Sequence, residues 1–131
     1  MSIPVPLQHM DSAVAERGAA AYVLTVSDRG TPHVVHAELT RTAEGFVALV
    51  GAGTAHNASC RPQISVLYPC RRIDDYSLII DAVATVVATP DGARLRLALT
   101  RAVLHRPGPA PDPKISACGA DCIPLSLSED R

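Results

Sequence analysis

Aromatic residues are scarce in this chain of 131 residues. There is no tryptophan, Phe46 is the single phenylalanine, and aromatic residues together make up 3% of the chain. The hydrophobic core must therefore be built from valine, leucine, isoleucine and alanine. Apolar residues as a whole make up 47%, which is enough for one core and not for two. A small barrel of aliphatic side chains buries little area per residue, so we expect it to gain stability by pairing with a second copy.

Neither sign of charge is in excess. The chain has 12 basic and 13 acidic residues, its formal net charge is -1, and Lys114 is the single lysine. Proteins that bind nucleic acids present a basic face that releases counterions from the phosphates. We therefore expect no nucleic-acid partner.

Long apolar runs are also missing. No run approaches the roughly 20 residues of a membrane-spanning helix, and residues 1–6 lack the charged and apolar regions of a secretory signal. These absences predict a cytoplasmic protein with no membrane partner. In that compartment we expect reduced thiols at Cys60, Cys70, Cys118 and Cys122.

Strand patterns dominate the first 105 residues. Runs rich in β-branched residues, bounded by turn signals, predict six strands, and capping signals at Asp11 and Thr54 predict two short helices. Gly18 suits the left-handed exit from the first helix. The strands are expected at residues 21–26, 33–41, 46–50, 63–68, 76–89 and 93–105, and the helices at 11–17 and 54–60.

The short turns between these strands predict their pairing. The first three strands are expected to form an antiparallel meander, and the last two a hairpin that turns at Pro90-Asp91-Gly92. Leu95 and Leu97 would lie on the face of that hairpin that packs against the core, and Arg94 and Arg96 on the face exposed to solvent.

The order of elements predicts a mainly β fold, a six-stranded antiparallel split β-barrel with Greek-key character and two short helices. Closing the sheet hides strand edges that a small β domain must protect. Residues 1–105 would form this barrel. Residues 106–131 hold five prolines and a Cys-x3-Cys pair, and are expected to form an extended tail.

An ordered set of segments covers about residues 10–105 of the chain. Its members are AYVLTVSD at 21–28, GTPHVV at 30–35, GAGTAHNA at 51–58 and RPQISVL at 61–67. This set resembles the pyridoxamine 5'-phosphate oxidase-like split-barrel family. The segment ACGADCIP at 117–124 resembles the ending of an actinobacterial branch of that family.

The resemblance implies a homodimer with a cofactor groove at its interface, which holds FMN or the deazaflavin F420. The ring would lie along the second and third strands, and the phosphate over the helix that follows Gly53. A helix N-terminus favours phosphate because its first N–H groups are free and carry partial positive charge. The residues implied are Val34, Val35, His36, Val50, Gly51, Ala52, Thr54, His56 and Asn57.

The helix departs from the family pattern at one position. The family usually places Lys or Arg there to neutralise the phosphate, whereas this chain has His56, and Arg61 is the nearest fixed cation. Two functions therefore stay open. The chain is either an FMN- or F420-dependent oxidoreductase with a small-molecule substrate, or a non-catalytic dimer without flavin that binds another small ligand, such as haem or a phosphorylated metabolite. No side chain is assigned a catalytic role.

The sequence patterns for metal binding and for thiol chemistry are weaker than those for a flavin-type barrel. His33 and His36 fall on opposite faces of one strand, so they do not form a His-x-x-His site, and we expect no metal site. Cys118 and Cys122 are interpreted as a reduced or redox-labile pair rather than metal ligands, and a thiol-dependent regulator is the third hypothesis.

Overall fold

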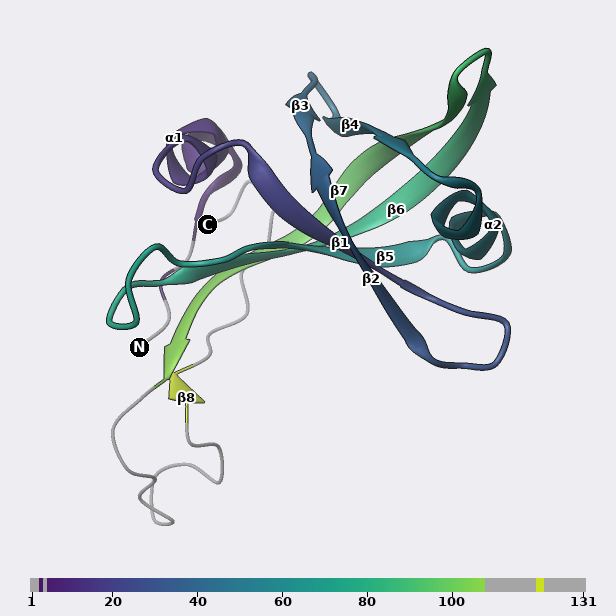
Figure 1. Ribbon diagram of the computed structural model, residues 1–131. Helices are drawn as coiled ribbons and strands as arrows, with labels where there is room; N and C mark the ends of the chain where they lie inside the picture. The colour runs from purple at the N-terminus through teal and green to yellow at the C-terminus, as the bar shows by residue number, and fades with distance from the viewer. Residues whose placement is uncertain (1–2, 4, 108–119, 122–131) are drawn as a thin grey trace.

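The computed structural model describes residues 3, 5–107 and 120–121, which form an antiparallel sheet with two α-helices (Figure 1). The helices are η1 (Leu7–His9), α1 (Met10–Ala15) and α2 (Ala52–Cys60). The strands are β1 (Ala20–Val26), β2 (Pro32–Glu38), β3 (Thr40–Arg41), β4 (Gly45–Val50), β5 (Gln63–Tyr68), β6 (Ser77–Thr89), β7 (Gly92–Pro107) and β8 (Ala120–Asp121). Within the described residues, no helix is long and apolar enough to cross a membrane.

The sheet follows the order β2-β1-β5-β6-β7-β4-β3, and β8 pairs with β7 off this path. The path has seven strands rather than the expected six, because residues 33–41 divide into two. Strand β2 pairs with β1 only as far as Glu38, which faces Ala20 at the start of β1. Beyond that point Thr40 and Arg41 pair with β4 instead.

Both turns of the expected meander join antiparallel strands, but the second pairing is shorter than expected. The turn at residues 42–45 does join two antiparallel strands, but these are the short β3 and β4. The other edge of β4 pairs with the distant strand β7, from Gly45 opposite Ala98 to Val50 opposite Ala93. A local turn predicts its own hairpin, whereas the partner on the far edge depends on how the whole sheet curls.

The β6–β7 hairpin is confirmed. Leu95 and Leu97 are buried, and Arg94 and Arg96 are exposed, as the alternation predicts. The register shifts once, between Asp81 and Ala82. Strand β7 continues to Pro107, past the expected boundary at residue 105, and β8 pairs with its last two residues.

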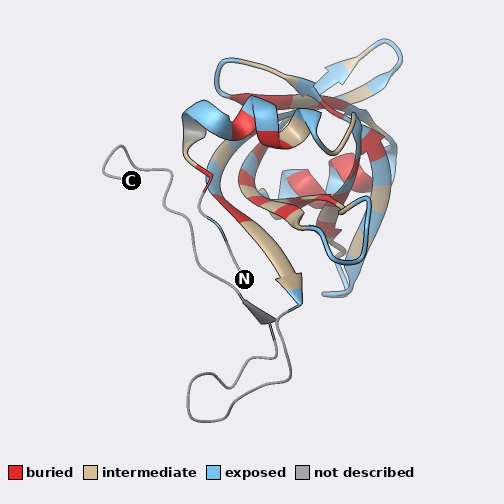
Figure 2. Ribbon diagram, turned by 90° about the vertical axis from the view of Figure 1, so that its left-hand side faces the viewer, coloured by how far each residue is buried: buried red, intermediate tan, exposed pale blue. Residues whose placement is uncertain are grey.

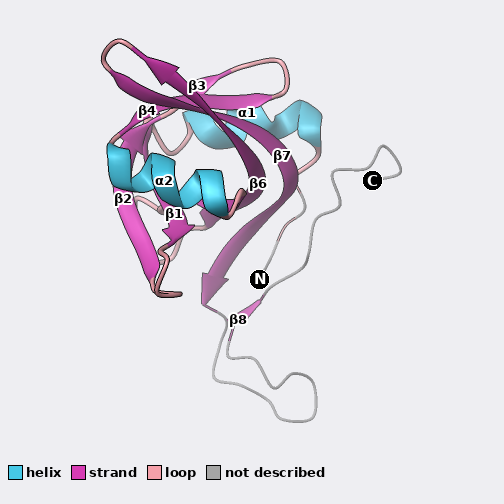
Figure 3. Cartoon of the chain, turned by 90° about the vertical axis from the view of Figure 1, so that its right-hand side faces the viewer, coloured by secondary structure: helices cyan, strands magenta, loops and turns pink. Residues whose placement is uncertain are grey.

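The curled sheet encloses one core, and buried residues alternate with exposed ones along its strands (Figure 2). The two end strands of the path, β2 and β3, are joined through the single buried residue Leu39. The helices α1 and α2 lie at opposite ends of the barrel (Figure 1), and α2 lies across one opening (Figure 3).

The helix starts differ from the capping expectation. His9 caps α1 and Gly51 caps α2, so Asp11 and Thr54 each lie inside a helix. Neither side chain makes a capping hydrogen bond: the Asp11 carboxylate instead accepts one from Arg41 Nε at 2.9 Å, and Thr54 is buried. Gly18 has a φ of 88°, which confirms the left-handed exit after α1.

Phe46 and Tyr68 are the large rings of an otherwise aliphatic core. Their centroids are 6.1 Å apart, and both side chains are almost completely buried. The Tyr68 hydroxyl has no hydrogen-bond partner among the described residues. Burial raises the pKa of Tyr68 to about 12.

We expect the buried phenol to make stability fall at high pH. Between pH 10 and pH 12 the unfolded tyrosine ionises while the folded one keeps its proton, so stability that is complete below pH 10 is lost as pH rises. The slope would reach about 1.4 kcal/mol per pH unit. Tyr68→Phe should remove this component and leave stability at neutral pH unchanged or higher, because it deletes an unpaired buried hydroxyl.

Urea unfolding at a series of pH values measures this effect. The matched control is Tyr22→Phe, since Tyr22 is 39% exposed and its variant should retain the alkaline loss. An unaltered alkaline slope in Tyr68→Phe would contradict the assignment.

Candidate functional site

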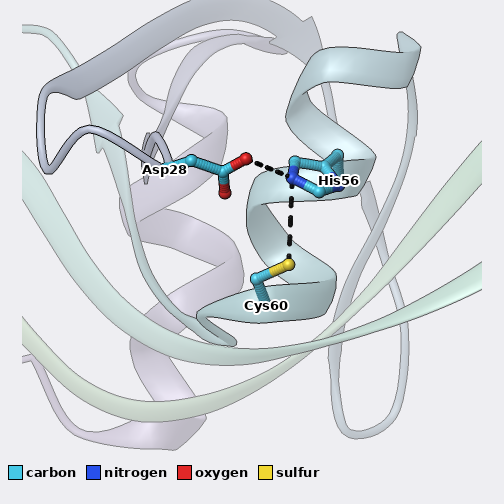
Figure 4. Close-up of side chains that lie close together, drawn as sticks. All are labelled: Asp28, His56 and Cys60. Atoms are coloured by element: carbon cyan, nitrogen blue, oxygen red, sulfur yellow. Dashed lines mark hydrogen bonds and ion pairs between the residues drawn. The ribbon is translucent and has the colours of Figure 1, made fainter.

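Three chemically reactive side chains meet beside the second half of α2 (Figure 4). His56 and Cys60 are one helical turn apart on its exposed face, and Asp28 comes from the turn between β1 and β2. His56 Nε2 lies 2.8 Å from Asp28 Oδ2 and 3.9 Å from Cys60 Sγ. We call these three residues the α2 cluster.

The β1–β2 turn holds Asp28 in place. Ser27 N–H donates to the Thr31 carbonyl at 2.9 Å, and Gly30 N–H donates to the Ser27 carbonyl at 2.8 Å. The Ser27 hydroxyl also accepts a hydrogen bond from Thr31 N–H. This closed turn carries the Asp28 carboxylate to the face of α2.

Arg61, the residue after α2, completes the environment of Asp28. Its Nε donates to the Val26 carbonyl at 2.8 Å, and its Nη2 donates to Asp28 Oδ1. The hydrogen bond from Arg61, followed by that from His56, lowers the pKa of Asp28 below its ordinary value. The Arg61 guanidinium is therefore already paired with the Asp28 carboxylate.

The bond pattern of the α2 cluster excludes a nucleophilic triad. A triad needs the thiol on one ring nitrogen of the histidine and the carboxylate on the other. Here both groups approach Nε2 (Figure 4). The ligand atoms of the three residues lie within 4.8 Å of one another, a spacing that a metal ion can bridge. The His-x3-Cys spacing on a helix was the sequence signal for this site, and Asp28 had none.

The structure separates the residues expected to hold a phosphate. Thr54 and Asn57 are 2% and 6% exposed, and the Asn57 amide donates to the Thr25 hydroxyl at 3.1 Å in the core. Arg61 follows the last residue of α2, about 13 Å along the helix axis from its start. Their side chains therefore do not surround the start of α2.

The start of α2 is open. Gly51 caps it without a side chain, and the first helical bond runs from Ala55 N–H to the Gly51 carbonyl. The N–H groups of residues 52–54 precede that bond and have no partner within the helix. The space where a Cβ would lie at Gly51 and at Gly53 is empty. The backbone here can bind an anion without any side chain.

The remaining expected residues divide between the two faces of the sheet. Val34 is 53% exposed and His36 is exposed on the outer face, where the His36 and Tyr22 rings are 5.5 Å apart. Val35 and Val50 are half-buried and pack against the core.

A groove of about 520 Å³ lies along the same outer face of the sheet. Ser65 and Asp81, on adjacent strands, place one polar pair in it, with Ser65 Oγ donating to Asp81 Oδ1 at 2.9 Å. The apolar lining of the groove includes Leu24, Val26, Pro32 and Val83, and its polar lining also includes Gln63 and Thr100. The volume falls in the ordinary range for small-ligand sites, about 300–1,000 Å³. Because its residues come from separate strands, their meeting was not visible in the sequence.

Two of the four cysteines lie outside the described residues. The expectation of a redox-labile Cys118 and Cys122 pair therefore stays a prediction. Cys60 and Cys70 are free thiols, exposed and half-buried respectively.

No protein-family model matches this chain. The uncharacterized protein Mb0449c of Mycobacterium bovis is 34% identical over 122 residues, which cover 82% of this chain and 85% of the relative. The uncharacterized protein MT0457 of Mycobacterium tuberculosis matches with the same identity and coverage.

Two solved structures resemble the fold. HutZ, the heme storage protein from Vibrio cholerae, has a TM-score of 0.60 at 19% identity, over 76% of this chain and 94% of that chain. The FAD binding protein from Mycobacterium smegmatis has a TM-score of 0.58 at 13% identity, over 79% of this chain and 95% of that chain. At these identities the likeness concerns the fold alone, and it confirms the mainly β split barrel.

Proposed function

We propose that this chain, which belongs to the family of the mycobacterial proteins Mb0449c and MT0457, binds a flavin as a homodimer of the pyridoxamine 5'-phosphate oxidase-like type. The flavin would be FMN or the deazaflavin F420, and the reaction an oxidation or reduction of a small molecule. The similar folds of HutZ, a heme storage protein, and of the mycobacterial FAD binding protein support a flavin or haem ligand.

The open start of α2 carries this proposal. Three consecutive backbone N–H groups without helical partners, next to empty space, suit the phosphate of a cofactor. The segment Gly51-Ala52-Gly53 has no side chain large enough to obstruct that approach. The phosphate ligands in this proposal are backbone amides, not the buried side chains of Thr54 and Asn57.

The outer-face groove supports a flat, largely apolar ligand. Aliphatic side chains contribute most of the exposed wall of the groove. The Ser65 and Asp81 pair, together with Gln63 and Thr100, supplies polar groups that would orient a ring. Few further side chains are needed for catalysis, because a flavin carries the electron chemistry and the protein supplies position and access.

We place the interface of the proposed homodimer on the same outer face of the sheet. Leu24 pairs with exposed Val34 of β2, and Tyr22, on the same face of β1, pairs with Leu67 of β5, so an apolar band runs across β2, β1 and β5. Tyr22, 39% exposed, extends the band. An outward sheet face in a small barrel is ordinarily polar, and an apolar one indicates a surface that another protein covers.

The test combines visible absorption spectroscopy with a variant that adds a negative charge at the start of α2. FMN or F420 added to the protein should shift its visible absorption band. Ala52→Asp should weaken this binding by at least about tenfold, because the carboxylate repels the phosphate and competes for the same N–H groups. The same substitution should stabilise the ligand-free protein by about 0.5 kcal/mol through the helix dipole.

The matched control is Ala52→Ser, because serine is close to alanine in size and adds no charge. It should bind the flavin as the unmodified chain does. No spectral change with either flavin, or equal affinity in Ala52→Asp, would contradict the proposal.

Haem is the second candidate ligand. His36 is an exposed imidazole beside Tyr22 on the apolar band, where it could ligate iron. The first turn of α2 also contains no charged residue to neutralise a flavin phosphate. A Soret band that appears with haemin and shifts in His36→Ala would favour this function over the flavin.

A further inference from the structure

We propose that Asp28, His56 and Cys60 bind a divalent transition-metal cation of the zinc type. The proposal does not depend on the proposed function, since none of the three residues lines the groove or belongs to the first turn of α2.

The donor set selects the class of metal. One imidazole nitrogen, one thiol sulfur and one carboxylate oxygen converge, and this mixture suits a borderline-soft cation such as Zn²⁺. Mg²⁺ and Ca²⁺ prefer sets made of oxygen atoms, so they are poor occupants. The thiol must lose its proton to bind.

Two of the three separations between ligand atoms are close to those that a tetrahedral ion requires, and all three atoms lie within 4.8 Å of one another. Zinc bonds of about 2.0–2.3 Å place nitrogen and sulfur ligands about 3.6 Å apart, and nitrogen and oxygen ligands about 3.3 Å apart. The corresponding separations around His56 Nε2 are 3.9 Å to Cys60 and 2.8 Å to Asp28. All three residues are exposed, so small rotations of their side chains close the difference.

His56 Nε2 faces both Asp28 and Cys60, as it would across a bound ion. A neutral imidazole nitrogen either donates or accepts a hydrogen bond. If Nε2–H donates to Asp28, it cannot also accept the proton of Cys60, so hydrogen bonding satisfies only one of the two neighbours. A cation in front of Nε2 would bind all three atoms at once.

Arg61 prepares Asp28 for this role. Its guanidinium holds Oδ1 and leaves Oδ2 turned toward His56, so the carboxylate would bind the metal through one oxygen. The Arg61 charge is unfavourable next to a cation. The carboxylate and a thiolate together supply two negative charges that offset it.

Three protein ligands leave a fourth tetrahedral position open. Structural zinc sites usually have four protein ligands, whereas sites with three keep a water or another exchangeable ligand. The exposure of the α2 cluster gives such a ligand direct access from solvent. The site would therefore bind and release small ligands on the metal.

Cobalt absorption tests this inference on the full chain. Cys118→Ser and Cys122→Ser are introduced first, so that those two thiols cannot contribute. Co²⁺ added to this protein without oxygen should produce a thiolate-to-cobalt charge-transfer band and visible bands of tetrahedral cobalt, at one ion per chain. Zn²⁺ should then remove them by displacement.

Cys60→Ser in the same background should abolish the charge-transfer band, and His56→Ala should weaken Co²⁺ binding by about 100-fold or more. Cys70→Ser is the control thiol and should leave the spectrum unchanged. A missing band, or a band that survives Cys60→Ser, would overturn the inference.

Discussion

Gly45→Ala is expected to lower the free energy of unfolding by about 3 kcal/mol or more. A Cβ at this position would overlap the carbonyl oxygen of Leu97 and lie 2.9 Å from its carbonyl carbon, because β4 and β7 approach closely here. The backbone of Gly45 cannot easily move away from β7, because its carbonyl is held by hydrogen bonds. The Gly45 carbonyl accepts hydrogen bonds from Arg41 Nη1 at 2.7 Å and from Thr42 N–H at 2.9 Å.

Gly53→Ala is the matched control and should have the opposite sign. Gly53 lies in the first turn of α2 with open space at the Cβ position. Alanine favours the helix, so this variant should gain up to about 1 kcal/mol. Thermal or urea unfolding of both variants measures the difference. Equal stabilities would contradict the close approach of β4 to β7.

Val34→Glu is expected to convert the proposed homodimer to a monomer. Val34 is 53% exposed in the single chain, so the substitution should not disturb folding. In the dimer the new carboxylate would be buried in an apolar interface without a partner. The cost of such a charge is several kcal/mol, and the dimer should dissociate about 100-fold more readily.

Sedimentation equilibrium over a range of concentrations measures the association. Ile73→Glu is the control, since Ile73 is 92% exposed in the loop between β5 and β6, outside the apolar band. It should remain as dimeric as the unmodified chain. A monomeric unmodified chain, or an undisturbed dimer in Val34→Glu, would contradict the proposed interface.

For the expected phosphate site, the sequence predicts the residue types and the helix but not which side chains face outward. Thr54 and Asn57 are good phosphate donors by residue type, and their helix was located to within two residues. Which face of the helix points outward was not visible, because its weakly apolar sequence has no clear amphipathic pattern. The structure turns both side chains inward, where Asn57 pairs with Thr25.

The sequence by itself determined the strands, the alternation along β7 and the left-handed glycine after α1. These features depend on side-chain periodicity and backbone preferences over a few neighbouring residues. Tertiary structure alone decided that β4 pairs with β7, that Asp28 reaches His56 and Arg61, and that Ser65 and Asp81 share a groove. Each of these contacts joins residues at least 16 positions apart. They form only when the sheet closes, since closure, and not local preference, selects which distant segments meet.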